Sequence, residues 1–278
     1  MRRTIRGIDH VVIAVRDLDG AQRTYERLGF TLTPRGFHTL GSANHCIMFG
    51  SDYLELLALP RPHPALAYYA DFLAKGEGLA ALALATGNAD AAYAELGASG
   101  IAADAPLDFS RPVRLAEGER DASFRIVQLP PASTPGCRSF LCQHYTRELV
   151  WRPEYQTHPL GVTGLAAVAV VAEDAVAAAQ GYGRLFDVVP EQIEEGVLIA
   201  TGSAPIALAT RGKLGRRLPG VELPARARPI VAALFLRVAN RANAAAVLDR
   251  SGAKPVALPD GSFAIGARDA HGVALVFG

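Results

Sequence analysis

The stretch that decides the fold is Gly7-Ile-Asp-His10-Val-Val-Ile-Ala-Val15-Arg-Asp17-Leu-Asp-Gly-Ala-Gln-Arg-Thr-Tyr-Glu-Arg-Leu28-Gly29-Phe30. It predicts an apolar strand, then a short amphipathic helix that begins after the capping residue Asp17 and ends at Gly29. His10 stands inside the apolar strand, where burying an imidazole costs free energy unless a partner satisfies its hydrogen bonds. This histidine is therefore the first candidate for chemistry.

The same frame recurs three more times along the chain, each time without the histidine. The equivalents of Gly7, His10 and Asp17 are Gly78, Ala81 and Asn88 in the second copy, Gly164, Ala167 and Asp174 in the third, and, for the last two, Ala233 and Asn240 in the fourth. Asp and Asn side chains accept hydrogen bonds from the first amides of a helix, so each copy predicts a strand, a cap and a helix. A repeat of this kind defines the architecture of the whole chain.

Strand-like segments separated by turn signals follow each helix, so the repeated unit is βαβββ. One unit cannot bury the face of its own sheet, and we therefore expect the four units to pair into two domains. The boundary is expected in the stretch 151–161, which contains two prolines, and the domains in residues 1–155 and 156–278. Two further expectations are a strand at 101–107 and a long basic surface loop at 212–228.

Composition narrows the functional classes. The 278 residues carry a net charge of +1, which gives no electrostatic basis for binding nucleic acid. No apolar run reaches the roughly 18 residues of a membrane span, and the basic amino terminus leads into a strand rather than a signal-type apolar core. Three cysteines at irregular spacing do not form a disulfide framework. We expect a cytoplasmic protein that acts on a small-molecule substrate, with a homodimer as one form of assembly.

Several motifs add a family resemblance to this reading. They are the quoted first strand and helix, Gly41-Ser-Ala-Asn44-His45, Tyr53-Leu54-Glu55-Leu56, Phe140-Leu141-Cys142-Gln143-His144 and Leu149-Val150-Trp151-Arg152-Pro153. With these motifs the chain resembles the vicinal oxygen chelate superfamily, and within it the glyoxalase-like proteins, over essentially its whole length. The resemblance implies an α+β fold in which the four units pair into two curved mixed sheets of the glyoxalase/dihydroxybiphenyl-dioxygenase type. Such folds host lyases, isomerases, epimerases, ring-cleaving dioxygenases and antibiotic-resistance proteins.

The resemblance also implies a divalent metal held by residues of the first and last strands of each unit. Carried over residue by residue, this gives His10, Glu55 and His144 as metal ligands, whereas Ala81 leaves one ligand position without a donor. A 2-His-1-carboxylate set suits Fe(II), Zn(II), Mn(II), Ni(II) or Co(II) and leaves positions open for substrate or water. Gln143 and His45 stay open as alternatives for the third ligand. The metal itself is not identified by the sequence.

The residues themselves support part of this site. Strand alternation places Tyr53, Glu55 and Leu57 on one face, and a carboxylate on such an apolar strand is rarely buried without a partner.

Around His10 and Glu55 we expect His45 as a general base, and Asn44, Arg111 and Tyr145 as substrate-binding residues. The remaining histidines, His38, His63, His158 and His271, lie in loop-like contexts and are expected at the surface.

The second domain carries no side chain of this kind. Its counterparts of the ligand positions are Ala167, Ala233, Ala207 and Val276, none of which can bind a metal. The site is therefore expected in the first domain. The leading hypothesis is a metal-dependent lyase or isomerase acting on a small oxygen-rich substrate. The alternatives are an Fe(II) dioxygenase of the ring-cleaving type and a non-catalytic protein that binds a small molecule or antibiotic.

Overall fold

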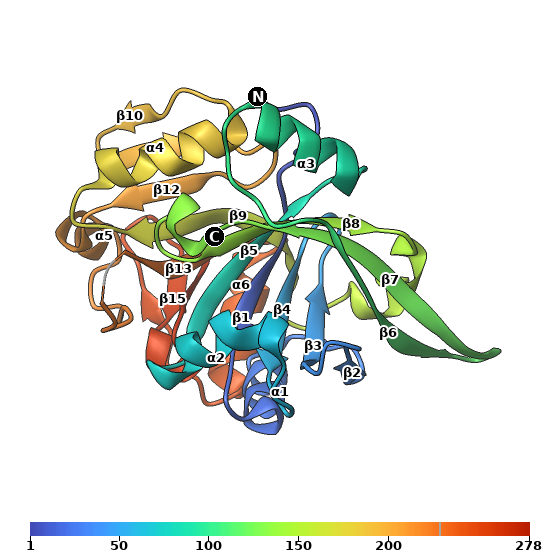
Figure 1. Cartoon of the computed structure of the whole chain (residues 1–278). Helices are drawn as coiled ribbons and strands as arrows, with labels where there is room; N and C mark the ends of the chain where they lie inside the picture. Colours follow the sequence, from blue (N-terminus) through green and yellow to red (C-terminus); the bar gives the residue numbers. More distant parts are fainter. Residues whose placement is uncertain (228) are drawn as a thin grey trace.

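The computed structural model describes residues 1–227 and 229–278 and contains the βαβββ unit four times (Figure 1). The first unit comprises β1 (Ile8–Ala14), α1 (Leu18–Arg27), β2 (Gly36–Phe37), β3 (Ala43–Met48) and β4 (Tyr53–Ala58), and the second β5 (Gly78–Ala85), α3 (Ala89–Ala98), β6 (Leu107–Leu115), β7 (Gly118–Gln128) and β8 (Arg138–His144). The third comprises β9 (Val162–Val171), α4 (Ala175–Phe186), β10 (Glu191–Ile193), β11 (Gly196–Ile199) and β12 (Ile206–Ala209), and the fourth β13 (Ile230–Val238), α6 (Arg241–Arg250), β14 (Val256–Ala257), β15 (Phe263–Ile265) and β16 (Ala274–Phe277).

Two helices, α2 (Ala67–Ala74) and α5 (Arg211–Arg217), connect the units within each pair. Short 3₁₀ turns lie at Pro64–Leu66, Pro131–Ser133, Arg147–Leu149, Pro153–Tyr155 and Ala267–Ala270. Among the described residues no helix is long and apolar enough to cross a membrane.

The strands form two eight-stranded mixed sheets, which confirms the predicted fold class. Their orders are β2-β3-β4-β1-β5-β8-β7-β6 and β10-β11-β12-β9-β13-β16-β15-β14. In each sheet the first strand of one unit runs antiparallel to the first strand of the next, and parallel to the last strand of its own unit. The domain boundary near residue 155 stays a prediction; it falls in the connection between the last strand of one sheet and the first strand of the other.

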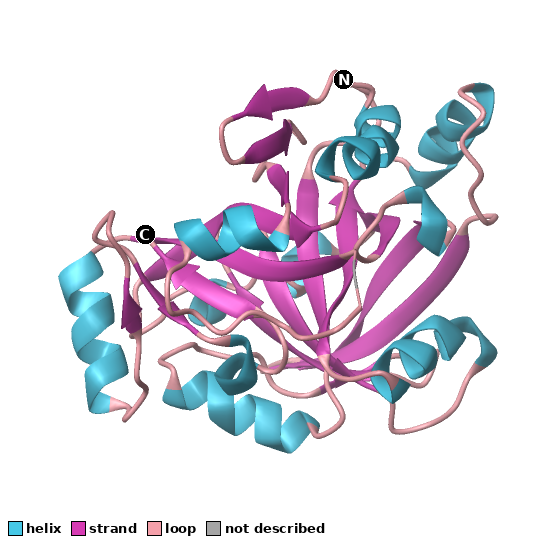
Figure 2. Ribbon diagram, turned by 90° about the vertical axis from the view of Figure 1, so that its left-hand side faces the viewer, coloured by secondary structure: helices cyan, strands magenta, loops and turns pink. Residues whose placement is uncertain are grey.

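The caps explain why each first strand gives way to a helix. The side chains of Asn88, Asp174 and Asn240 each accept a hydrogen bond from an amide of the following first turn, as predicted. Asp17 makes no such bond, although α1 begins directly after it. The helices lie on the outside of the molecule and the strands at its centre (Figure 2).

Two expectations about the connections were wrong. The stretch 101–107 is not a strand, because β6 begins only at Leu107 and forms a long hairpin with β7 that projects from the body of the molecule (Figure 1). The stretch 212–228 is not simply a loop, since α5 occupies its beginning, up to Arg217; residue 228 lies outside the described residues. The capping residue Thr210, which accepts from the amide of Lys213, marks the start of this helix.

The two connecting segments give the sheets different concave faces. In the second sheet, Leu214 of α5 and the following Leu218, Val221 and Leu223 pack onto alanine-rich strands and fill the face with apolar side chains. In the first sheet, the corresponding segment covers the face through Leu66 and, on α2, Tyr69, and leaves a cavity beneath it. The apolar faces turned the other way join helices and both sheets in one shared core. Of the two concave faces, as far as residues 1–227 and 229–278 describe them, the first is the one with a cavity.

Candidate functional site in the first sheet

The cavity lies on the concave face of the first sheet, and the space inside it that is open to water-sized molecules is about 70 Å³. Most of its wall is apolar, and its polar groups gather at one end. The lining side chains used below are His10 of β1, His38, Asn44 and Cys46 of β3 and the turn before it, Tyr53 and Glu55 of β4, Phe109 and Arg111 of β6, Phe124 and Ile126 of β7, and Arg138, Phe140 and Cys142 of β8. Alternation on each strand turns these residues to the same face. The predicted inward set Tyr53, Glu55 and Leu57 is confirmed.

His10 is held in one orientation by three neighbours. Its ring stacks on Tyr53 with centroids 4.3 Å apart, meets Phe140 edge-on at 5.7 Å, and places Nδ1 2.7 Å from Oδ2 of Asp9. Because a carboxylate only accepts, Nδ1 carries the hydrogen, and the neutral ring then has its lone pair on Nε2. That atom faces the cavity and lies 3.7 Å from Oε2 of Glu55. The sequence thus brings together the imidazole and carboxylate that it singled out.

Asp9 fixes this arrangement from behind. Its side chain is buried, and the same oxygen that accepts from His10 also accepts from Nε2 of His144 at 3.0 Å. Burial acts to raise the pKa of Asp9, but the hydrogen bonds from His10 and His144 outweigh it, and the pKa lies well below its ordinary value. Asp9 is therefore ionised and keeps the Nδ1–H tautomer of His10 in place. Cys142, 3.6 Å from His144, completes a compact Asp–Cys–His group.

Glu55 is bound from the opposite direction. Oε1 accepts a hydrogen bond of 2.6 Å from the amide nitrogen of Asn44, while Nε2 of His38 lies 3.9 Å from the same oxygen. Nδ1 of His38 contacts the hydroxyl of Ser42 at 2.8 Å, and the Asn44 amide nitrogen, which can only donate, lies 3.4 Å from Nε2. The lone pair of His38 therefore also lies on Nε2. Burial lowers the pKa of His38 to about 4, against the opposing effect of Glu55, so the ring is neutral near pH 7.

The other predicted site residues lie in different places. Asn44 and Arg111 line the cavity, as expected for substrate-binding positions. His45 does not, because alternation turns it to the opposite face of β3, where its Nδ1 donates to the carbonyl of Thr33 at 2.8 Å. The structure thus does not bring His45 into the cavity beside Glu55. Tyr145, expected to bind substrate, is also outside the lining of the cavity: it follows the end of β8 and is 52% exposed.

His144 and Gln143, two of the candidates for the third ligand, lie away from Glu55. His144 contacts Asp9, and thus lies beyond the Nδ1 side of the His10 ring, away from the atom that faces Glu55. Gln143 points to the other face of β8, where its carbonyl oxygen accepts from the amide of Ala89 at the start of α3. The structure does not bring either side chain to the His10–Glu55 pair.

Sequence reasoning missed Asp9 and His38. His38 was expected at the surface, as was His158, yet both histidines are buried. His158 joins the carbonyl of Met48 to the amide of Thr31. The sequence did contain a signal for His38. His38 and Ser42 flank a turn that contains a glycine directly before β3, and such a turn brings the two side chains together.

The side chains of the cavity supply some, but not all, of the donors that a divalent cation needs. The central strands of the fold offer His10 on β1 and Glu55 on β4, but β5 and β8 offer Ala83 and Phe140 at the level of His10. His38 adds a second neutral imidazole beside Glu55, so the donor chemistry is two ring nitrogens and one carboxylate. The two nitrogens approach different oxygens of Glu55, at 3.7 and 3.9 Å, and among the described residues only Asp9, Cys142 and His144 bring three donor atoms close together.

Comparison with known proteins agrees with the fold. The family model described as glyoxalase-like domain matches residues 8–186. A hypothetical protein from Staphylococcus aureus is similar over 98% of both chains, with a TM-score of 0.69 and 13% identity. A mutant of 4-hydroxymandelate synthase from Streptomyces coelicolor is similar over 99% of this chain and 92% of its own, with a TM-score of 0.64 and 14% identity. No curated protein matches the chain.

The likeness to these two structures shows the fold, and the family model spans the cavity with its polar end. The chain therefore belongs to the glyoxalase-like domain family of the vicinal oxygen chelate superfamily.

Proposed function

We propose that this protein is a metal-dependent lyase or isomerase that acts on a small oxygen-rich substrate in the cavity of the first sheet. The observation that carries the proposal is the lone-pair nitrogen of His10 facing the carboxylate of Glu55, 3.7 Å away, inside a mostly apolar cavity. Two polar groups of this kind are costly to bury unless they bind something between or beside them.

His10, Glu55 and His38 are the residues that would hold a divalent cation. When bound, such an ion supplies polarisation of adjacent substrate oxygens and stabilises negative charge that develops on them. We propose His38 for the third position in place of His144, because His38 lies beside Glu55 whereas His144 lies on Asp9.

The protein's own side chains orient the histidine, move the proton and exclude water. Asp9 orients the His10 ring and fixes its tautomer, the kind of support that metal-binding histidines generally have. Asn44 holds Oε1 of Glu55, which leaves Oε2 to take a proton from the substrate and return it at a neighbouring atom. Phe140 and Phe124 keep water from the polar end of the cavity and so strengthen the charges within it.

Two other functions have specific support. The donor set of two imidazoles and one carboxylate also suits a non-haem Fe(II) dioxygenase. Ala83 and Phe140, in turn, favour a binding protein without turnover, because they remove donors from the two central strands of the second unit.

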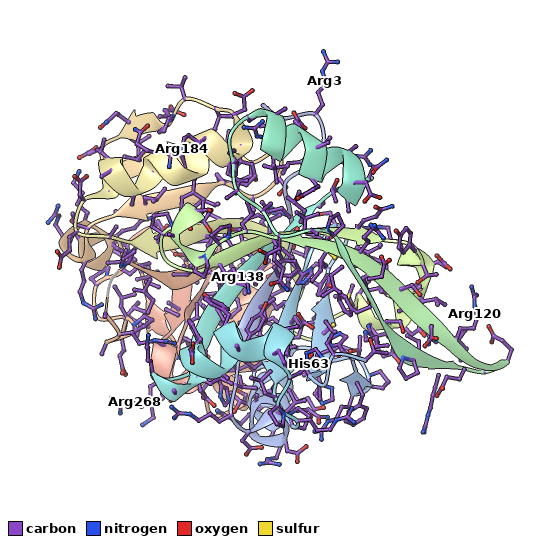
Figure 3. The ribbon with its side chains drawn as sticks, in the orientation of Figure 1. Arg3, His63, Arg120, Arg138, Arg184 and Arg268 are labelled. Atoms are coloured by element: carbon purple, nitrogen blue, oxygen red, sulfur yellow. The ribbon has the colours of Figure 1, made fainter. Side chains whose placement is uncertain are left out.

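Metal analysis of the purified protein tests the proposal. We expect about one equivalent of a divalent metal in the wild type, lost in both His10→Ala and Glu55→Gln. The matched controls are His63→Ala and Glu117→Gln, which change an exposed imidazole and an exposed carboxylate (Figure 3 labels His63 beside α2). Metal-free wild-type protein, or metal retained in both cavity variants, would contradict the proposal. Oxygen consumption that depends on added Fe(II) would favour the dioxygenase instead.

A further inference from the structure

One positive charge in the cavity has no counterpart in the protein. Arg111 of β6 is 6% exposed and lines the cavity. Among residues 1–227 and 229–278 its guanidinium has neither a hydrogen bond nor an ion pair within 4 Å, whereas the buried Asp9 has ion-pair contacts with both His10 and His144. None of its nitrogens is among the buried polar atoms that lack a partner, so the guanidinium meets open space in the cavity or at its mouth, where a bound anion can take up its five donors. The position is thus prepared for an anion that the chain itself does not supply.

The second arginine of the cavity shows the contrast. Arg138 donates to the carbonyl of Leu129 at 3.1 Å, lies 3.4 Å from a carboxylate oxygen of Asp104, and covers the ring of Tyr68. Its charge is therefore used within the fold. Arg120, farther along the same hairpin as Arg111, lies at the outer end of that hairpin, in solvent (Figure 3). Arg111 differs from both because it is buried and uncommitted.

The place of Arg111 connects it to the polar end of the cavity. A side chain at Gly36 would come within 3.0 Å of Cδ of Arg111 and within 2.5 Å of Oδ1 of Asn44, so the arginine crosses the open backbone of Gly36 beside Asn44. Asn44 donates to Glu55, and its Oδ1 is buried without a hydrogen-bond partner. An anion on Arg111 would therefore lie next to the Asn44–Glu55–His10 row, and the unpaired Oδ1 of Asn44 would be open to a hydrogen-bond donor elsewhere on the same ligand.

The apolar walls of the cavity indicate the chemistry of the rest of the ligand. Phe109 and Phe124 stack with centroids 5.0 Å apart and form one side of the cavity, while Ile126 and Phe140 continue the apolar surface. One uncommitted cation balances one negative charge, whereas a phosphate dianion would need further cations. The planar fork of arginine also matches a carboxylate with two parallel hydrogen bonds.

We infer that the substrate is a monocarboxylic acid with an apolar or aromatic body, and that Arg111 binds its carboxylate. This inference rests on the proposed function, since it names the substrate class for the same cavity. The carboxylate fixes one end of the molecule on β6, and the atoms next to it then lie beside Glu55 and His10, where the proton moves.

Ligand-induced thermal stabilisation and calorimetry test this inference with phenylacetate and its neutral isostere phenylacetamide. The proteins are the wild type, Arg111→Met, Arg111→Lys and Arg114→Met, the last being an exposed arginine on the same strand. We expect the wild type and Arg114→Met to bind phenylacetate about tenfold more tightly than the amide, Arg111→Met to lose that preference, and Arg111→Lys to keep part of it. Without ligand, Arg111→Met should melt at about the same temperature, because the guanidinium has no hydrogen bond or ion pair with the described residues to lose.

Formate, acetate, benzoate, phosphate and chloride at equal ionic strength complete the panel, so that the outcome does not depend on one compound. The inference is wrong if no carboxylate stabilises the wild type more than chloride does, if phosphate alone stabilises it, or if Arg111→Met keeps the preference. Repeating the titration with a chelator separates the two proposals. A carboxylate preference that survives in metal-free protein and requires Arg111 supports this inference even where metal analysis contradicts the proposed enzyme. A preference that chelation abolishes and Arg111→Met retains overturns it.

Discussion

The buried ring of His38 makes the stability of the fold depend on pH in a way that can be calculated. Burial lowers the pKa of this imidazole from 6.5 to about 4. Between these two pH values the unfolded chain binds a proton at His38 that the folded chain does not, so the free energy of unfolding falls as the pH falls. At about 1.4 kcal/mol per pH unit, the full effect is about 3 kcal/mol, complete below pH 4 and absent above pH 6.5.

Replacing the ring by a side chain that does not titrate isolates this contribution. Urea unfolding of the wild type and of His38→Gln, measured from pH 4 to pH 8 with a chelator at constant ionic strength, gives the two curves. We expect the wild type to lose about 3 kcal/mol more than the variant between pH 7 and pH 4. His45 and His158, whose pKa values burial also lowers, are present in both proteins and cancel in the difference. Parallel curves would show that His38 is not held neutral by burial, and would refute the geometry assigned to the polar end of the cavity.

Three further changes give independent tests. Asp9→Asn removes the ionised acceptor of two imidazoles, so metal affinity measured by competition with a chelator should fall by about 10- to 100-fold; unchanged affinity would contradict the supporting role of Asp9. Gly36→Ala places a Cβ 2.5 Å from Oδ1 of Asn44, and calorimetry should then show weaker binding of phenylacetate; wild-type binding would mean that the cavity is wider there than described. His158→Leu leaves the buried carbonyl of Met48 without its donor, and urea unfolding should show a loss of about 2–3 kcal/mol, whereas a loss below about 0.5 kcal/mol would refute the bond.

The sequence by itself determined the repeated unit, the pairing of units and the inward face of Glu55, whereas the meeting of His10 with Glu55 was implied by the family resemblance. The first three features depend on local rules: apolar periodicity, caps such as Asn88, and the alternation that turns every second residue of a strand to one face. Alternation fixes a face once one residue is assigned. It therefore predicted the inward position of Glu55 correctly and, applied to β3, would have excluded His45 once Asn44 was placed inward.

Only the tertiary structure decided which further groups join this pair. His38 lies in a turn, where no periodicity indicates a direction, and it reaches Glu55 because the glycine turn folds back over the sheet. Arg111 comes from the far edge strand of the same sheet, and His144 is drawn to Asp9 by a bond between strands far apart in the chain. Such contacts depend on how strongly the sheet curves and on which side chains fill its concave face. That curvature is a property of all eight strands together, and no single segment of sequence encodes it.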